Sequence, residues 1–340
     1  MAQHRRIYVT GAAGFIGYHL AAMLLAEGCA VHGFDGMTPY YDPALKRARL
    51  ALLQAQPGFS FTEAMLEAPG ALAADMAAFR PDAVVHLAAQ AGVRYSLEAP
   101  RSYLTANIEG TFNVLEAARD CGVKHLLLAS TSSVFGANTE MPYRETDKAD
   151  TQVSLYAATK KATENLSHSW AHLWGLPTTA FRFFTVYGPW GRPDMAPHRF
   201  TRAILAGDPI DVYGHGDMYR DFTYVTDLVR AIRLLIDVAP VRPEGPADIA
   251  PDDSLSPVAP WRVVNIGNGA KVALGDFIAA IEAAAGHAAV RNLMEMQKGD
   301  VVATWADTSL LQRLTGYRPE TPIVAGMARF VDWYRAYYGV

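Results

Sequence analysis

The sequence predicts an α/β protein with a doubly wound parallel sheet and a smaller C-terminal α/β substrate-binding lobe. Three observations support this fold class: short apolar runs alternate with helical stretches at regular spacing, a glycine-rich turn follows the first run, and the alternation stops after about Gly188. Strands that alternate with helices lie parallel, because each crossover helix returns the chain to the same edge of the sheet.

Elements of the first half can be placed from these runs. The expected strands are Ile7–Thr10, Val31–Phe34, Ala83–Leu87, His125–Ala129 and Thr178–Phe183. The expected helices are Ile16–Glu27, Pro43–Gln54, Ala71–Phe79, Pro100–Cys121 and Leu155–Trp174. We therefore expect a nucleotide-binding domain at 1–185 and a mainly substrate-binding lobe at 186–340, with some interleaving, and an exposed proline-rich loop at 239–260.

Composition excludes several classes of protein. The 340 residues are 51% hydrophobic and 19% charged, which suits a globular chain that buries a large core. Net charge is −4 and the Lys and Arg residues are scattered, so we expect no nucleic-acid partner. No run of about 20 apolar residues occurs, and Cys29 and Cys121 lack metal-ligand spacing. We expect a cytoplasmic protein without a membrane span or a metal site.

The turn after the first strand has the spacing of a dinucleotide site, with Gly11, Gly14 and Gly17 in a G-x-x-G-x-x-G pattern. Gly11 permits the tight turn, Gly14 lets the backbone approach a pyrophosphate, and Gly17 lets the helix pack closely on the strand. A glycine-rich turn alone can be purely structural. However, Asp35 ends the second strand, where its carboxylate can accept bonds from ribose hydroxyls. No arginine follows it to receive a 2′-phosphate, so a Rossmann-type NAD site is predicted.

A second motif places Tyr156 and Lys160 four residues apart, on one face of a helix. A free phenol titrates near ~10, but a neighbouring ammonium and a positive nicotinamide ring both favour the phenolate. Such a tyrosine is a usable base near neutral pH. Most Tyr-x-x-x-Lys pairs are only helix neighbours, but here the pair follows both the glycine turn and the hydroxyl cluster Ser130–Ser133 at a strand end.

Seven segments resemble the UDP-glucuronate 4-epimerases, within the extended branch of the short-chain dehydrogenase/reductase superfamily, the NAD-dependent epimerases and dehydratases. They are TGAAGFIG (10–17), HLAAQAGVRYSLE (86–98), ASTSSVFG (129–136), SLYAATKK (154–161), RFFTVYGPWGRPDMA (182–196), RDFTYVTD (220–227) and NIGN (265–268). The resemblance covers almost the whole chain and implies an NAD-dependent nucleotide-sugar 4-epimerase, an isomerase, acting on a UDP-uronic acid.

The resemblance also implies catalytic roles. Tyr156 would be the base, Lys160 would lower its pKa and bind the nicotinamide ribose, and Thr131 would hydrogen-bond the reacting hydroxyl. Hydride would pass from sugar carbon 4 to NAD and return to the other face of the turned 4-keto sugar. Besides Tyr156 and Lys160, the implied cofactor-binding residues are Gly11, Gly14, Phe15, Ile16, Gly17, Asp35, Leu66, Leu87, Ala88, Ala89, Gln90, Ser130 and Phe183.

The UDP end of the substrate falls to the second lobe. The resemblance implies Arg220 for the diphosphate, Arg192 for the uridine ribose or phosphate, and Asp300 for ribose hydroxyls. Without the resemblance, a surface position or an ordinary salt bridge would be the preferred interpretation of all three. For Arg94, a substrate contact and a surface arginine are equally good interpretations.

The end of the expected fourth strand separates related activities. Dehydratases that resemble this chain carry Thr-Asp-Glu there, and UDP-glucuronate decarboxylases tend to carry Glu at the position of Ser133, whereas this chain has Thr131, Ser132 and Ser133. These hydroxyls, with Thr185, can hydrogen-bond a substrate carboxylate. Because a 4-keto uronic acid loses CO₂ when its carboxylate bond stands perpendicular to the carbonyl plane, holding that group near the plane would prevent the loss.

Alternatives remain open on the same scaffold: a UDP-glucuronate decarboxylase, a UDP-hexose 4-epimerase, or a non-catalytic NAD-sensing scaffold protein. Met65 stands where the family usually has an Asp that binds the adenine amino group, a loss on the order of 1 kcal/mol. Phe135 stands where the family commonly has Tyr. The helices around 103–121 and 155–174 carry more apolar residues than one sheet face covers, and relatives pair through such helices. We therefore expect a homodimer, although these faces could instead be core.

Overall fold

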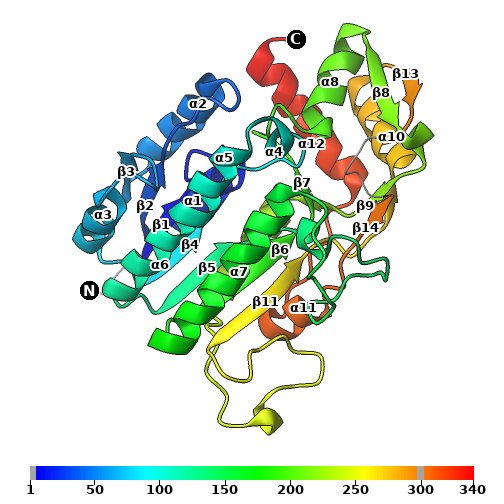
Figure 1. Ribbon diagram of the computed structural model, residues 1–340. Helices are drawn as coiled ribbons and strands as arrows, with labels where there is room; N and C mark the ends of the chain where they lie inside the picture. Colours follow the sequence, from blue (N-terminus) through cyan, green and yellow to red (C-terminus); the bar gives the residue numbers. More distant parts are fainter. Residues whose placement is uncertain (1–4, 297–301) are drawn as a thin grey trace.

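A parallel sheet of seven strands forms the centre of the computed structural model, which describes residues 5–296 and 302–340 (Figure 1). The strands run in the spatial order β11-β6-β5-β4-β1-β2-β3. Their bounds are β1 Arg6–Thr10, β2 Ala30–Asp35, β3 Phe59–Glu63, β4 Ala83–His86, β5 His125–Ala129, β6 Thr178–Phe183 and β11 Trp261–Ile266. The order reverses between β1 and β4, which is where open α/β sheets bind ligands at the carboxyl ends of their strands.

Helices cover both faces of this sheet, as a doubly wound fold requires. One face carries α1 (Phe15–Ala26), α9 (Val225–Leu235) and α11 (Ser309–Thr315), and the other carries α3 (Ala71–Phe79), α6 (Gly110–Asp120) and α7 (Leu155–Trp174). Helix α2 spans Pro43–Gln54. In β1, Ile7 and Val9 pack on the first face while Tyr8 packs on the second, as the two-residue period of a strand dictates. The predicted fold class is confirmed.

A second lobe packs around its own core of α8 (Ala196–Ala206), α10 (Leu274–Ala285) and α12 (Ile323–Tyr338). Within the described part of this half, three small sheets form: β7 (Thr185–Tyr187) with β10 (Phe222–Tyr224), β8 (Pro209–Tyr213) with β13 (Val290–Met294), and β9 (Tyr219–Arg220) between β12 (Val272–Ala273) and β14 (Ala303–Thr304). Strand β11 nevertheless joins the central sheet beside β6, and α9 packs on α1. Segments that follow the expected 185/186 boundary in sequence therefore return to the central sheet.

Two further segments can be compared with the sequence-based expectations. The stretch expected as one helix from Pro100 to Cys121 is α5 (Pro100–Tyr103), a π-helical segment η1 (Leu104–Glu109) and α6. The 239–260 segment has only the short 3₁₀ turn η4 (Pro246–Asp248) and is largely exposed. None of the helices in the described residues is both long and apolar enough to cross a membrane.

Candidate active site

The glycine turn between β1 and α1 has no room for side chains at Gly11, Gly14 or Gly17, and a Cβ on Gly14 would lie 2.9 Å from the Gly11 carbonyl oxygen. Gly11 has φ +72°, and a Cβ there would lie 2.8 Å from the backbone nitrogen of Ala88. A Cβ on Gly17 would lie 2.0 Å from the carbonyl oxygen of Gly11, so only glycine lets α1 approach the turn this closely. The N-terminus of α1 begins at Phe15, where free N–H groups favour an anion. This cradle fits the pyrophosphate of a dinucleotide.

Asp35 lies at the end of β2 beside the glycine turn and is 7% exposed. Its carboxylate accepts N–H bonds from Ala13 (3.2 Å) and Met37 (2.8 Å), which fix its orientation. Each carboxylate oxygen can accept more than one hydrogen bond, so capacity remains for ribose hydroxyls. The turn and Asp35 together satisfy the geometry predicted for NAD.

The loop after β4 carries the predicted residues Leu87, Ala88, Ala89 and Gln90, and buried polar groups hold it. The Thr10 hydroxyl oxygen accepts the N–H groups of Leu87 and Ala88, both at 3.2 Å. Nδ1 of His86 lies 2.7 Å from that same oxygen, and its Nε2 lies 3.0 Å from Oγ1 of Thr111. Burial lowers the pKa of His86 to about 3, with Lys160 adding to the effect, so this imidazole is a neutral structural link.

Asn107, which the motifs did not single out, completes the support of this loop. It lies in η1, and its Oδ1 accepts the N–H of Gln90 at 2.8 Å. Its Nδ2 donates to the Gln90 carbonyl at 3.1 Å and to Oγ1 of Thr159 at 3.0 Å. Thr159 in turn donates to the Tyr156 carbonyl at 2.9 Å. The amide of Asn107 thus joins the predicted cofactor loop to the helix of the predicted base.

Tyr156 and Lys160 both lie on the buried face of α7, where Ser154 caps the helix by accepting the N–H of Ala157 at 3.2 Å. Burial raises the pKa of the Tyr156 phenol, while a side-chain hydrogen bond with Thr131 and the charge of Arg192 lower it. Burial lowers the pKa of Lys160 to about 8, opposed by Glu164. The structure therefore brings the predicted tyrosine, lysine and threonine together.

A buried ion pair lies directly behind them, and sequence reasoning did not find it. Glu164 is fully buried, and its carboxylate accepts two bonds from Arg182, at 2.9 and 2.8 Å. Ser130 donates its hydroxyl to the same carboxylate at 2.6 Å, and Lys161 lies 3.1 Å from it. The predicted cofactor contact Ser130 thus has its hydroxyl committed to Glu164. The sequence shows Glu164 one turn after Lys160 and three residues after Lys161, but it does not reveal the contacts with Arg182 and Ser130, which lie on other elements.

A cleft of about 640 Å³ opens beside Tyr156 and Thr131, between the sheet and the second lobe. Predicted residues from both halves of the chain line it: Phe15, Ile16, Arg94, Thr131, Ser132, Ser133, Tyr156, Phe183, Thr185, Arg192 and Arg220. Thr131 donates to Ser133 Oγ at 3.3 Å, so the hydroxyls at the end of β5 form one cluster. The cleft has the size of a small-molecule site.

The predicted arginines approach the cleft from different elements. Arg192 pairs with Asp194 at 2.6 Å, and the Tyr40 hydroxyl donates to the same carboxylate at 3.1 Å. Arg94 lies 5.2 Å from the ring of Tyr213. Arg220, in β9, donates to the carbonyls of its neighbour Tyr219 and of Val302. Asp300 lies outside the described residues.

Met65 replaces the aspartate that the family usually has on the adenine side of the NAD site, and its neighbour Leu66 is a predicted cofactor residue. Leu66 is 7% exposed and packs against Gly110, whereas Met65 is 37% exposed. The Met65 sulfur lies so close to Gly36 that a Cβ on that glycine would be 2.3 Å away. A thioether, a weak acceptor, therefore lies next to the residue that follows Asp35.

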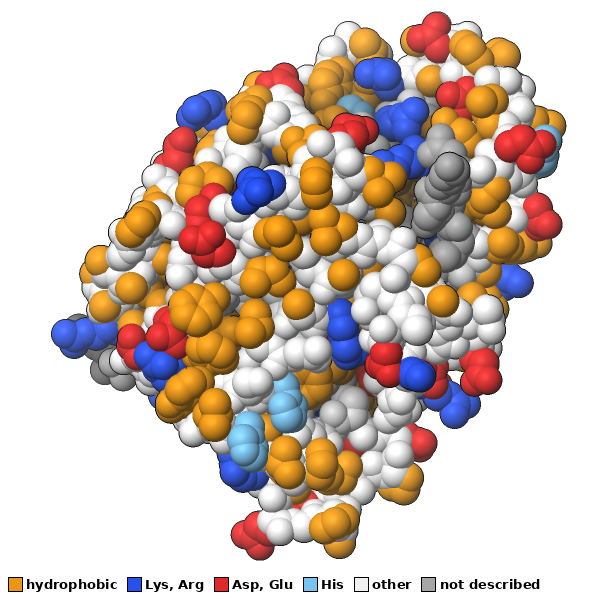
Figure 2. Space-filling model, in the orientation of Figure 1, with side chains coloured by type: hydrophobic (Ala, Val, Ile, Leu, Met, Phe, Trp, Pro, Cys, Tyr) orange, Lys and Arg blue, Asp and Glu red, His pale blue; other side chains and the backbone are white. Residues whose placement is uncertain are grey.

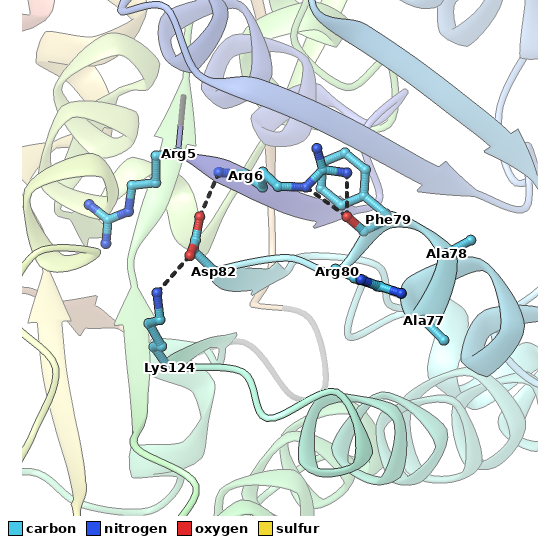
Figure 3. A pocket seen from close by; sticks show the side chains of 8 residues that line it. All are labelled: Arg5, Arg6, Ala77, Ala78, Phe79, Arg80, Asp82 and Lys124. Atoms are coloured by element: carbon cyan, nitrogen blue, oxygen red, sulfur yellow. Dashed lines mark hydrogen bonds and ion pairs between the residues drawn. The ribbon is translucent and has the colours of Figure 1, made fainter. Parts of the chain in front are cut away.

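A second hollow, of about 840 Å³, lies at the opposite edge of the sheet and includes none of the predicted residues (Figure 3). Asp82 accepts the N–H of Arg6 and the ammonium of Lys124 there, and the Arg6 guanidinium donates to the Phe79 carbonyl. These groups satisfy one another at the amino ends of the strands, away from the ligand-binding edge. Among the described residues, no cluster of three or more His, Cys, Asp or Glu could hold a metal ion.

Comparisons with known proteins show what the chain is similar to. The model of the "NAD dependent epimerase/dehydratase family" matches residues 7–245. A probable UDP-glucuronate 4-epimerase of Rhizobium meliloti (strain 1021) is 53% identical over 335 residues, which is 98% of each chain.

Solved structures show the same fold. The UDP-glucuronic acid 4-epimerase from Bacillus cereus, in complex with UDP-glucuronic acid and NAD, has a TM-score of 0.86 at 31% identity and covers 98% of this chain and 100% of that one. A UDP-glucose 4-epimerase from Thermotoga maritima has a TM-score of 0.84 at 27% identity, with 98% and 99% covered. Fold likeness alone therefore does not choose the sugar.

Proposed function

The chain belongs to the NAD-dependent epimerase/dehydratase family, and from that premise we propose that it interconverts UDP-glucuronate and UDP-galacturonate by inverting carbon 4 of the sugar. The observation that carries the choice is the hydroxyl cluster Thr131, Ser132 and Ser133, which lines the cleft beside Tyr156 without a carboxylate at these three positions. Elimination and decarboxylation in relatives use acids there, whereas epimerisation needs only a base and a hydride acceptor.

Tyr156 is the proposed base at the 4-hydroxyl. Thr131 and Arg192 favour its phenolate against the opposing effect of burial, and Lys160 adds a buried cation one turn along the helix. NAD, held by the glycine turn and Asp35, supplies the hydride acceptor and donor. Replacing Tyr156 with Phe should lower kcat about 10²- to 10⁴-fold without displacing NAD, since only the proton transfer is removed. A Phe variant that keeps its activity would contradict this role.

The remaining predicted cofactor residues have proposed backbone and apolar roles. Leu87, Ala88, Ala89 and Gln90 would border the nicotinamide end, on the loop that Thr10 and Asn107 hold, while Phe15 and Ile16 would present N–H groups to the pyrophosphate. Ser130, Leu66 and Phe183 would complete the walls of the site.

The hydroxyls at the end of β5, with Thr185 at the start of β7, are proposed to hold the substrate carboxylate. If they keep it near the plane of the 4-keto group, CO₂ is retained during the turn of the sugar. Thr131→Ala or Ser132→Ala should therefore release a UDP-pentose and CO₂ beside the epimer. Ser169→Ala is the matched control, because Ser169 is exposed on α7 and donates only to its own helix. Epimer alone from both site variants would refute the role.

The second lobe is proposed to anchor UDP while the sugar turns. Arg220 would bind the diphosphate, Arg192 the uridine ribose or phosphate, and Arg94 the substrate from the opposite wall. Asp300 would bind ribose hydroxyls. The proposed division into an NAD domain at 1–185 and a UDP-sugar lobe at 186–340 follows these roles, although β11, α9 and α11, which follow residue 185, pack with the central sheet.

We further propose a homodimer in the cytoplasm. Figure 2 shows hydrophobic side chains gathered over α6 and α7, and the exposed hydrophobic residues of η1, α6 and α7 include Leu104, Phe112, Leu173 and Trp174. Such a patch exceeds what scattered surface residues produce. Both cysteines are free, which fits a reducing compartment. Phe112→Glu should convert a dimer to monomers in sedimentation, and a wild-type monomer would refute this proposal.

A further inference from the structure

Arg49, on α2, is fully buried and joins two distant loops. Its Nη1 donates to the Ala13 carbonyl at 3.2 Å and to the Tyr41 hydroxyl at 2.8 Å. Its Nη2 donates to the carbonyls of Trp190 at 2.5 Å and Gly191 at 3.5 Å. One planar guanidinium therefore holds the glycine turn against a loop that lies 141 residues after Arg49 in the chain.

The second of these loops, residues 188–192, ends at the cleft arginine Arg192. Trp190 has φ +63°, a left-handed conformation that a bulky residue adopts only when its surroundings impose it. His19 of α1 holds the same loop, with Nε2 2.8 Å from the Pro189 carbonyl, and burial lowers the pKa of His19 to about 4, so it is neutral. The position of Arg192 over the cleft therefore depends on contacts made by α1 and α2.

Within residues 5–296 and 302–340, Arg49 makes no ion pair with a carboxylate. Its hydrogen-bond partners are carbonyls and a hydroxyl, and its Nε has no partner. Two neighbouring cations do have a carboxylate close by. Lys46 lies near the charge of Asp35, and Arg192 forms an ion pair with Asp194. A buried cation without a counter-ion is costly. The pyrophosphate proposed at the glycine turn would supply the missing negative charge.

We propose that Arg49 is a positioning residue that couples the NAD site to the substrate site. Its charge favours the dinucleotide pyrophosphate, and its fork fixes the 188–192 loop, so that a filled glycine turn and a correctly placed Arg192 stabilise each other. This inference rests on the proposed binding of NAD and a UDP-sugar. It assigns a function to a residue on α2 that does not line the cleft.

Two substitutions separate the positive charge of Arg49 from the hydrogen bonds that its guanidinium makes to the two loops. Arg49→Met removes both, so bound NAD should be lost about ten-fold faster during gel filtration, and KM for UDP-glucuronate should rise about ten-fold, a typical coupling between sites. Arg49→Lys keeps the charge but cannot span both loops, so NAD retention should recover while KM stays raised. At saturating NAD and sugar, kcat should change less than about three-fold, since Arg49 touches neither reacting group.

Arg47→Met is the matched control, because Arg47 is exposed on the same helix. The proposal is overturned if Arg49→Met retains wild-type NAD release and KM, or if Arg47→Met produces the same changes. Should Arg49→Met fail to fold, hydrogen exchange in the wild-type protein decides. Removing NAD should speed amide exchange in residues 188–195 but not in α9, and equal exchange with and without NAD would refute the coupling. Wild-type protein that retains NAD yet converts no UDP-glucuronate would instead refute the proposed function.

Discussion

Replacing Glu164 with Gln should destabilise the protein by about 3–5 kcal/mol, the cost of leaving one partner of a buried ion pair unpaired. Glu164 is fully buried and the Arg182 side chain is 3% exposed. The carboxylate accepts both bonds of the Arg182 fork and the Ser130 hydroxyl. A glutamine of the same shape offers one acceptor and turns an amide donor towards these donors, so the guanidinium loses its counter-charge without gaining water.

Urea unfolding of the NAD-saturated protein at pH 7, at one fixed protein concentration, measures this loss. Asp150→Asn is the control, because its partner Lys148 is 3.7 Å away and both side chains are exposed, so it should change stability by less than about 0.5 kcal/mol. A loss below about 1 kcal/mol in Glu164→Gln would show that the pair is solvated and would contradict its role as a buried ion pair.

The Glu164 carboxylate should also make the free energy of unfolding fall at acid pH. Burial raises the pKa of Glu164, but the charge and hydrogen bonds of Arg182 override it, with Lys161 and Ser130 adding, so the pKa falls below its usual 4.5 to about 2. A depressed folded-state pKa stabilises the protein fully above pH 4.5, and this contribution disappears as the pH falls towards 2. Unfolding free energies of wild type and Glu164→Gln should therefore converge over that range. A constant difference between them would contradict the sign.

Three further predictions follow from the site. Met65→Asp should tighten NAD binding by on the order of 1 kcal/mol, about five-fold, by restoring an adenine acceptor; unchanged release of NAD would place the adenine elsewhere. Gly17→Ala should abolish NAD binding, read as bound nucleotide per chain, because its Cβ would meet the Gly11 carbonyl, whereas Gly275→Ala on α10 has open space and should not change NAD content. Glu164→Gln should also move the alkaline limit of kcat to lower pH. Burial lowers the pKa of Lys160 to about 8 and Glu164 opposes that effect, so removing the carboxylate lowers this pKa further. An unchanged alkaline limit would show that the protonation of Lys160 does not control kcat.

Local signals predicted most of the nucleotide-binding half. Three expected helices and two expected strands, among them Leu155–Trp174 and His125–Ala129, have the bounds that the alternation of β-type runs and helical stretches indicated. Strand β11 was missed because Trp261–Ile266 follows some 80 residues of the second lobe and gains its place only by pairing with β6. The π-helical segment η1 was missed because it contains no Gly or Pro that would interrupt the expected helix. The hydrogen bonds of Asn107 reach other elements, the loop after β4 and α7.

The site residues likewise divide into those that local spacing predicted and those that it did not. Tyr156 and Lys160 were predictable because a spacing of four residues fixes a shared helical face. Glu164 with Arg182, and Arg49 with Trp190, meet across different elements, and a single sequence does not reveal such pairs. The second-lobe arginines came only from the family resemblance, and their roles stay predictions.

The return of the abstracted hydride to carbon 4 can be followed with UDP-glucuronate that carries deuterium at carbon 4. Incubated with the purified protein, it should give a mixture with UDP-galacturonate in which the product keeps its deuterium at carbon 4, with no net reduced NAD, because the same hydride leaves and returns. Loss of the label to water, a UDP-pentose with CO₂ as the main product, or no conversion at all would contradict the account.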